Sequence, residues 1–193
     1  MDFKTVETKK ENIQPLKKGH VKSAVLESSC FEEPELRRKR CEFVKLLRSC
    51  EDLDDPLEPW YQYIIWTEQH YPRGSKDGKL DQLLEKCIKK FKTSLLYKED
   101  QRFIRIYLNF AFHHQDPEEV YYQMFTFRIG LECADLYKAW SWELERLKST
   151  GAAMGILNRG IRHSYRLKEE LEAALEALMA RIRRGTDPAL LLV

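Results

Sequence analysis

Apolar side chains recur every three or four residues in eight successive stretches after Pro34. This spacing places them along one side of an α-helix, which turns once every ~3.6 residues. No alternation of period two competes with it, and only 8 Gly and 7 Pro are available for tight turns. The pattern therefore predicts an all-α chain of eight helices. The clearest stretch carries Leu80, Leu83, Leu84, Cys87, Ile88 and Phe91.

Two Asp-Pro pairs indicate where helices begin. Asp55-Pro56 precedes the second stretch and Asp116-Pro117 precedes the fifth. An Asp side chain accepts hydrogen bonds from free N–H groups at a helix start, and Pro at the first helical position loses none. We therefore expect both pairs to begin helices. The apolar stripe predicted for the second helix consists of Leu57, Trp60, Tyr61, Ile64 and Ile65.

The seventh stretch, by contrast, is rich in small residues, including Ala153, Gly160 and Ser164. Small side chains allow neighbouring helices to approach closely. Helices of about 12–16 residues with short connections pack as antiparallel neighbours, and in pairs they approach the ~34-residue tetratricopeptide period. The sequence therefore predicts a TPR-like antiparallel helical-repeat superhelix over residues 34–185, preceded by a flexible arm over 1–33 and followed by a tail over 186–193.

The charge balance excludes some partners. The chain has 33 basic and 31 acidic side chains and a net charge of +2, which gives no general attraction to nucleic acid or to an anionic membrane. No apolar run has the length of a membrane span, and no signal peptide is visible. Five Cys without C-x-x-C spacing predict neither disulfides nor a zinc site, so we expect a reduced intracellular compartment.

Motifs for catalysis are also missing. The sequence contains no phosphate-binding glycine loop and no kinase signature. His113 and His114 are adjacent, so they point to different faces of a helix, and we interpret them as surface and cap residues. The basic run 37–40 lies within a helical pattern and fits a solvated face, with Arg40 toward the packing side. We therefore predict no catalytic residue, no metal site and no cofactor. A cysteine hydrolase using Cys87 or Cys133 is the remaining enzymatic alternative.

The most informative motif lies in the polar segment 1–33. This segment has too little apolar surface to fold alone, and we expect part of it to become helical on binding. It contains Lys10-Glu11-Asn12, whose side chains offer a cation, an anion and an amide that both donates and accepts. A receptor with complementary polar groups can bind all three in one short turn. The alternative is a solvated, charged tail.

The residues after this motif favour recognition. Gln14, Pro15 and Leu16 follow it after Ile13. Pro15 restricts the backbone before binding and so reduces the ordering cost. We therefore treat these three residues as flanking contacts.

Two segments, in this order, resemble the N-terminal region of the BubR/Mad family of spindle-assembly-checkpoint proteins. They are residues 10–19, KENIQPLKKG, and residues 55–74, DPLEPWYQYIIWTEQHYPRG. The second has the spacing D-P-L-x-x-W-x-x-Y-I-x-W-T-E-x-x-Y-P, which is specific to the Bub and BubR/Mad group. Weaker similarities extend the resemblance over about residues 10–182. The resemblance implies the same TPR-like helical domain.

The resemblance also implies a function. In this family the first KEN motif binds the WD-repeat co-activator of the anaphase-promoting complex as a pseudosubstrate, in a complex with a HORMA-domain checkpoint protein. Lys10, Glu11 and Asn12 would be the co-activator-binding residues here. The helical domain of relatives can bind a kinetochore-scaffold peptide, whose groove we leave unassigned. The implied location is the nucleus and cytoplasm, and the kinetochore in mitosis.

This sequence departs from the family in two ways. It contains no second KEN motif and no kinase or pseudokinase domain. Either it is a fragment, or it is a member that has lost these parts. Without a second KEN motif, inhibition of substrate recruitment is less firmly implied than co-activator binding.

Other functions stay open at this point. The chain could be the N-terminal scaffold of a Bub-type checkpoint kinase, or a HAT/TPR-type RNA-processing scaffold with an incidental KEN. The motif could also be a plain degron in a ligase substrate.

Overall fold

The computed structural model describes residues 34–72, 74–75 and 77–185, and this part of the chain contains eight α-helices and no strand. The predicted all-α class and the number of helices are therefore confirmed. Short 3-10 turns lie at Cys50–Asp52 and Tyr165–Leu167. The helices are α3 (Pro34–Arg48), α4 (Leu57–His70), α5 (Leu80–Phe91), α6 (Gln101–His113), α7 (Pro117–Thr126), α8 (Ala134–Arg146), α9 (Thr150–His163) and α10 (Lys168–Arg184).

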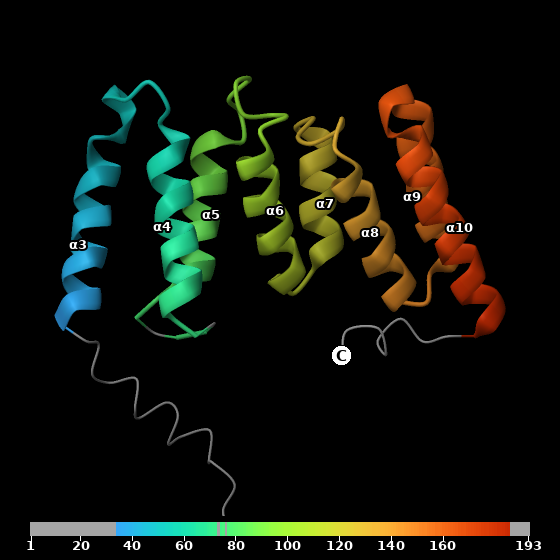
Figure 1. Ribbon diagram of the computed structural model, residues 1–193, viewed down its shortest axis with the longest axis horizontal. Helices are drawn as coiled ribbons and strands as arrows, with labels where there is room; N and C mark the ends of the chain where they lie inside the picture. The colour runs from blue at the N-terminus through green and yellow to red at the C-terminus, as the bar shows by residue number, and fades with distance from the viewer. Residues whose placement is uncertain (1–33, 73, 76, 186–193) are drawn as a thin grey trace, which may run out of the picture.

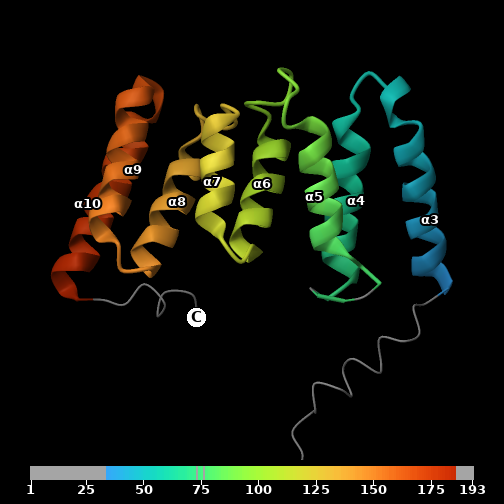
Figure 2. The same cartoon turned by 180° about the vertical axis from the view of Figure 1, so that it is seen from behind.

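The helices stand side by side in chain order, with α3 at one end of the row and α10 at the other (Figures 1 and 2). Consecutive helices run in opposite directions and pack on each other, and α4, α6, α8 and α10 also contact one another along the row. This is the predicted TPR-like repeat arrangement. The main contacts of each helix are with helices one or two places along the row, so the described part of the chain presents long surfaces.

Aromatic rings connect successive helices in the core. Phe91 of α5 contacts Trp60 of α4 edge to face, with ring centroids 6.4 Å apart, and Phe103 of α6 at the same distance. Phe103 in turn lies 5.2 Å from Tyr107, also edge to face. Edge-to-face contacts are a favoured arrangement of aromatic pairs. The predicted periodic apolar residues thus form one continuous core from α4 to α10.

The two Asp-Pro pairs behave differently. At α7 the prediction is confirmed: the Asp116 side chain accepts a hydrogen bond from the Glu119 N–H at 3.3 Å, and Pro117 is the first helical residue. At α4 the predicted start is wrong by one residue, since the helix begins at Leu57. The Asp55 carboxylate does accept from the Leu57 N–H at 3.2 Å, but its other contacts reach the start of α6.

The stripe predicted for α4 is partly wrong. Leu57, Trp60 and Ile64 are buried, whereas Tyr61 and Ile65 are only half-buried. Tyr63 and Thr67, on another side of the helix, are buried in addition. The reason is that α4 packs against α3 as well as against α5 and α6, so it buries more than one stripe.

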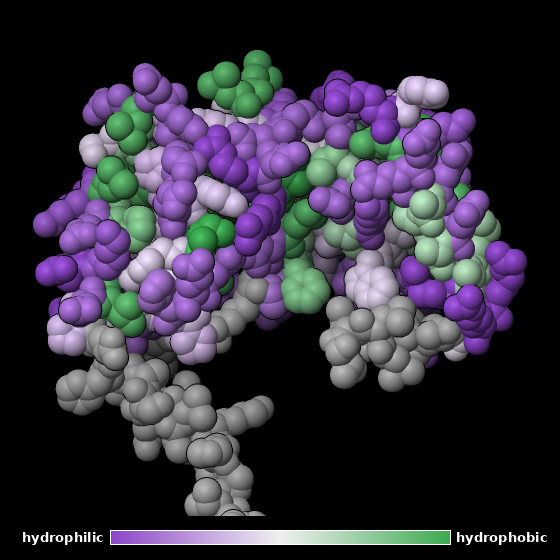
Figure 3. All heavy atoms as spheres, viewed as in Figure 1, coloured by the Kyte–Doolittle hydropathy of each residue, from purple (hydrophilic) through white to green (hydrophobic). Residues whose placement is uncertain are grey.

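Helix α3 is the least buried helix. None of its residues is buried. It is held by Phe43, which stacks on Tyr63 at 5.0 Å between ring centroids, and by Arg40, which donates to the Asp77 carbonyl at 2.6 Å. The other residues of the basic run, 37–39, are exposed, as predicted for a solvated face. Hydrophilic side chains also cover most of the face in Figure 3.

Candidate functional site

The predicted recognition motif lies outside the described residues. Lys10, Glu11 and Asn12, and the flanking residues 14–16, all belong to the segment 1–33. The structure therefore describes the body that carries this segment. Within this body, the candidate sites are the clusters of polar side chains between helices and the surface grooves.

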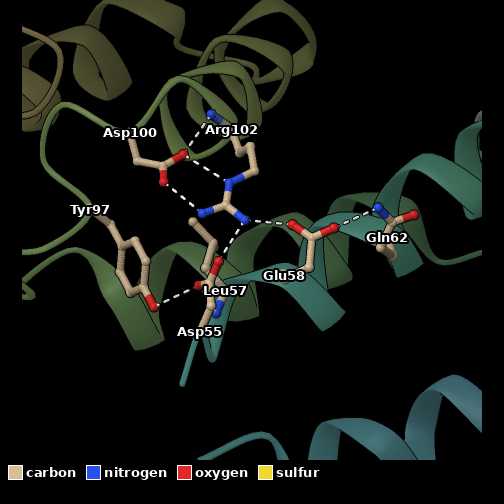
Figure 4. A network of polar contacts seen from close by, with 7 residues as sticks. All are labelled: Asp55, Leu57, Glu58, Gln62, Tyr97, Asp100 and Arg102. Carbon is tan, nitrogen blue, oxygen red and sulfur yellow. Dashed lines mark hydrogen bonds and ion pairs between the residues drawn. The ribbon is translucent and has the colours of Figure 1, made fainter. Parts of the chain in front are cut away.

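The densest polar cluster joins α4 to α6 around Arg102 (Figure 4). The Arg102 guanidinium donates to Asp55 at 2.7 Å, to Glu58 at 2.5 Å and to Asp100 at 2.7 Å. The Tyr97 hydroxyl donates to the second oxygen of Asp55 at 2.9 Å. Asp100 caps α6 by accepting from the Arg102 backbone N–H at 2.8 Å. One cation thus serves three carboxylates from two helix starts.

The charges in this cluster are fixed by their neighbours. Burial opposes ionisation of Asp55 and Asp100, but the hydrogen bonds and charge of Arg102 outweigh it and hold the pKa of both carboxyls below the ordinary value. Hydrogen bonds from Arg102 to Asp100, and also to Asp55 and Glu58, raise the pKa of the guanidinium. Burial, followed by the contact with Asp55, raises the pKa of the Tyr97 hydroxyl. The shifts of these four groups move their pKa values away from neutrality, as suits a structural junction and not proton transfer.

This cluster was missed as a unit by the sequence reasoning. Local spacing identifies Asp55 as a helix cap and indicates no role for Tyr97 or Arg102. Arg102 lies 47 residues after Asp55, so their contact depends on the packing of α6 beside α4. Asp55 therefore accepts a hydrogen bond at the start of α4 from the Leu57 N–H and also links α4 to α6 through Arg102.

The remaining residues of that segment are mainly structural. Trp60 and Tyr63 are under 9% exposed, and Thr67 is 1% exposed, with its hydroxyl donating to the Tyr63 carbonyl at 2.8 Å. Trp66 is half-buried and stacks with His70 at 5.0 Å between centroids. The second segment of the resemblance therefore mainly specifies the α4 core and its ends.

The described cysteine and histidine side chains give no support to a hydrolase. Cys87 is fully buried, and burial raises the pKa of its thiol, which disfavours the nucleophilic thiolate. Burial also raises the pKa of the Cys133 thiol. His113 is exposed at the end of α6 and His114 is its C-cap, as predicted. Within 34–72, 74–75 and 77–185, no three His, Cys, Asp or Glu residues are grouped to hold a metal ion.

The far end of the row is joined by a second ion pair. Arg181 of α10 donates two hydrogen bonds to Glu145 of α8, at 2.9 and 2.8 Å, and Glu145 is only 4% exposed. The guanidinium carbon also lies 5.7 Å from the Trp142 ring centroid. This pair fixes α10 to α8.

Among the described helices, none is long and apolar enough to cross a membrane.

The geometry describes a helical scaffold, and comparison with known proteins identifies it. The profile of Mad3/BUB1 homology region 1 matches residues 38–161. The chain belongs to this family. The matched range runs from α3 into α9 and includes the Arg102 cluster.

Curated members of the Mad3/BUB1 family show the same relationship. The chain is 34% identical over 142 residues to the mitotic spindle checkpoint component mad3 of Schizosaccharomyces pombe, covering 70% of this chain and 46% of that protein. It is 31% identical over 187 residues to the mitotic spindle checkpoint protein BUBR1 of Arabidopsis thaliana, covering 93% and 47%. It is 30% identical over 190 residues to the human mitotic checkpoint serine/threonine-protein kinase BUB1 beta, covering 95% and 18%. The chain spans less than half the length of these relatives.

Solved structures of the Mad3/BUB1 family agree with the fold. A chain in the crystal structure of the mitotic checkpoint complex matches with a TM-score of 0.72 and 29% identity, over 94% of this chain and 87% of that one. The conserved N-terminal domain of the checkpoint component BUB1 also has a TM-score of 0.72, at 24% identity, which supports the fold alone.

Proposed function

We propose that this chain is a Mad3/BubR1-type spindle checkpoint component that acts by binding and not by catalysis. Its Lys10-Glu11-Asn12 motif binds the WD-repeat co-activator of the anaphase-promoting complex as a pseudosubstrate. Gln14, Pro15 and Leu16 provide flanking contacts. The assembly is a mitotic checkpoint complex that also contains a HORMA-domain checkpoint protein, in the nucleus and cytoplasm and at kinetochores in mitosis.

One observation carries this proposal: the likeness to a chain of the mitotic checkpoint complex over 94% of the sequence. The chain also reads K-E-N-I-Q-P-L at residues 10–16, ahead of the family domain.

The helical body supports a scaffold role by its chemistry. The largest polar cluster among the described residues is a set of three carboxylates held by Arg102, and burial raises the pKa of the Cys87 thiol. Both features stabilise structure and neither activates a nucleophile. The 34–185 region then serves as a rigid carrier for the segment before it. The same proposal includes binding of a kinetochore-scaffold peptide by this region, in a groove that we leave unassigned.

The test replaces Lys10, Glu11 and Asn12 together by Ala in the intact chain. Binding to the purified co-activator should weaken at least tenfold, equivalent to about 1.4 kcal/mol, because three charged or amide contacts are lost. The control variant, Lys22→Ala with Glu27→Ala and Ser28→Ala, removes a cation, an anion and a polar group from the same segment. It should bind within about twofold of the parent, a difference of about 0.4 kcal/mol. Equal affinity of the KEN variant and the parent would refute the motif assignment.

A second measurement separates a pseudosubstrate from a degron. In a reconstituted ubiquitination reaction, the parent chain should reduce ubiquitination of a separate KEN-containing substrate, and the triple-Ala variant should not. Efficient ubiquitination of the chain itself, without inhibition, would instead make the motif a degron.

A further inference from the structure

A groove of about 600 Å³ runs between α3 and α5, above α4. Figure 2 shows this side of the molecule, with α5 in front of α4 and α3 beside them. Its apolar lining comes from all three helices, and Val44 on the α3 wall is 39% exposed. The apolar lining residues are Cys41, Val44, Leu47, Trp60, Tyr63 and Leu83.

The rim of this groove is strongly basic. Lys45 and Arg48 lie on α3. Lys79 directly precedes α5, and Lys86 lies within it. All four are exposed, and none has an ion pair with a described residue. With Arg40, the groove has five cations against the single acid Asp77, a formal charge of +4 where the whole chain has only +2.

Some cations elsewhere on the surface are, by contrast, paired with acids. On the same helix α5, Lys89 pairs with Glu85 at 2.7 Å and Lys90 pairs with Glu51 at 2.8 Å. On α8, Lys138 pairs with Glu170. The excess of cations over acids in the groove lining is thus larger than the net charge of the whole chain.

The groove lining also includes an unsatisfied donor. Trp60 is 8% exposed, and its indole N–H has no acceptor among the described residues. A buried polar group without a partner is uncommon in folded proteins. Because α3 has no buried residue, its groove side is also an apolar surface without a covering element in the described structure.

We propose that the α3–α5 groove is a docking site for an acidic amphipathic helix of a partner protein. The groove lining runs along residues 40–48 of α3 and 79–86 at α5, a length that matches a partner helix of about two turns. Apolar side chains at i, i+3, i+4 and i+7 of the partner contact Val44, Leu47 and Leu83. Its flanking Asp and Glu side chains pair with the rim cations, which also steer its approach.

The test uses the full chain and a fluorescent synthetic helix of about 16 residues, roughly the length of α3, with Leu along one face and Glu on the rest. We expect saturable binding that weakens as salt is raised, because the charge pairs are at the surface. A peptide of identical composition in scrambled order, and one with Lys in place of Glu, should bind at least tenfold more weakly. Equal binding of the scrambled peptide would overturn the proposal, as would no binding of the acidic helix.

Two matched charge reversals localise the binding. Lys45→Glu, Lys79→Glu and Lys86→Glu together should reduce affinity at least tenfold. Lys148→Glu, Arg162→Glu and Arg166→Glu together change the net charge equally at exposed positions away from the groove, and should reduce it less than twofold. Similar losses in both variants would mean non-specific attraction and would overturn the site.

A further variant tests the chain's own acidic residues as the occupant. Glu27→Lys with Glu32→Lys, made in the full chain, should leave peptide affinity unchanged. A gain of tenfold or more would assign the groove to the segment 1–33 and overturn the partner proposal. Dimerisation that the peptide disrupts would assign it to a second copy, with the same consequence.

Discussion

A single arginine at the start of α6 joins two helices that are far apart in the sequence. Arg102 contacts Asp55 and Glu58 across the α4–α6 boundary and Asp100 in its own first turn. Its side chain is 28% exposed, so solvent screens these pairs only in part. Without the guanidinium, three carboxylates would be left close together. The cluster therefore links the stability of this boundary to the ionisation of its acids.

The sign of that linkage gives a prediction for pH. The pKa of the Asp55 carboxyl is lower in the folded chain than its ordinary value of 3.8. Its contribution to stability is therefore complete well above that value and is lost as pH falls through 3.8 toward the folded pKa. We expect the urea midpoint of the parent to fall as pH decreases from about 5 to about 3, and that of Asp55→Asn to fall less.

Asp54→Asn is the matched control for this experiment. Asp54 is adjacent, exposed and without a hydrogen bond or ion pair to any described residue. Its variant should follow the pH dependence of the parent. If Asp54→Asn and Asp55→Asn change the pH profile equally, the Arg102 cluster is not the source of the linkage.

The sequence could predict the apolar stripes but not this cluster. Periodicity depends on residues three or four apart, and the stripe of residues 80–91 is buried as expected. Asp55 and Arg102 are 47 residues apart, and nothing local indicates that α6 returns beside the start of α4. The same limit explains α4, where Tyr63 proved buried because the pattern does not indicate how many neighbours a helix has.

At the scale of helices, α9 packs closely against α8 and α10 at Gly160. A Cβ atom at Gly160 would lie 2.5 Å from Leu171 Cδ1 and 2.8 Å from Tyr137 Cγ. These distances are below those of real contacts, so only glycine fits without a shift of the neighbours. The small residues of this stretch predicted close helix approach, and Gly160 confirms it.

Gly160→Ala should therefore destabilise the fold by roughly 1–3 kcal/mol through overpacking. Gly155→Ala, on the same helix, is the control, because a Cβ atom there meets nothing within 4 Å. This second change should stabilise by about 0.5–1 kcal/mol, since Ala is the better helix former. Urea denaturation of both variants measures the difference. We expect the two changes in unfolding free energy to have opposite signs. A loss of stability in both variants would point to backbone effects and not to the contact of Gly160 with α8 and α10.

At the scale of the whole molecule, the two ends of the row differ in how firmly they are attached. α3 has no buried residue and depends on the stacking of Phe43 and the Arg40–Asp77 contact. α10 buries Leu171 and Leu178 and is tied to α8 by Arg181. In a repeat assembly, stability is a sum over units and the interfaces between neighbours. The row should therefore open from the α3 end first.

Hydrogen exchange measures this difference directly. Amides in the middle of α3 should exchange at least about 100-fold faster than those of α6, equivalent to about 2.7 kcal/mol less protection, because local opening of α3 exposes little apolar surface. Phe43→Ala should increase exchange in α3 further and leave α8 and α9 unchanged, since neither helix contacts that ring. Uniform protection from α3 to α10 would mean that the row unfolds as one unit.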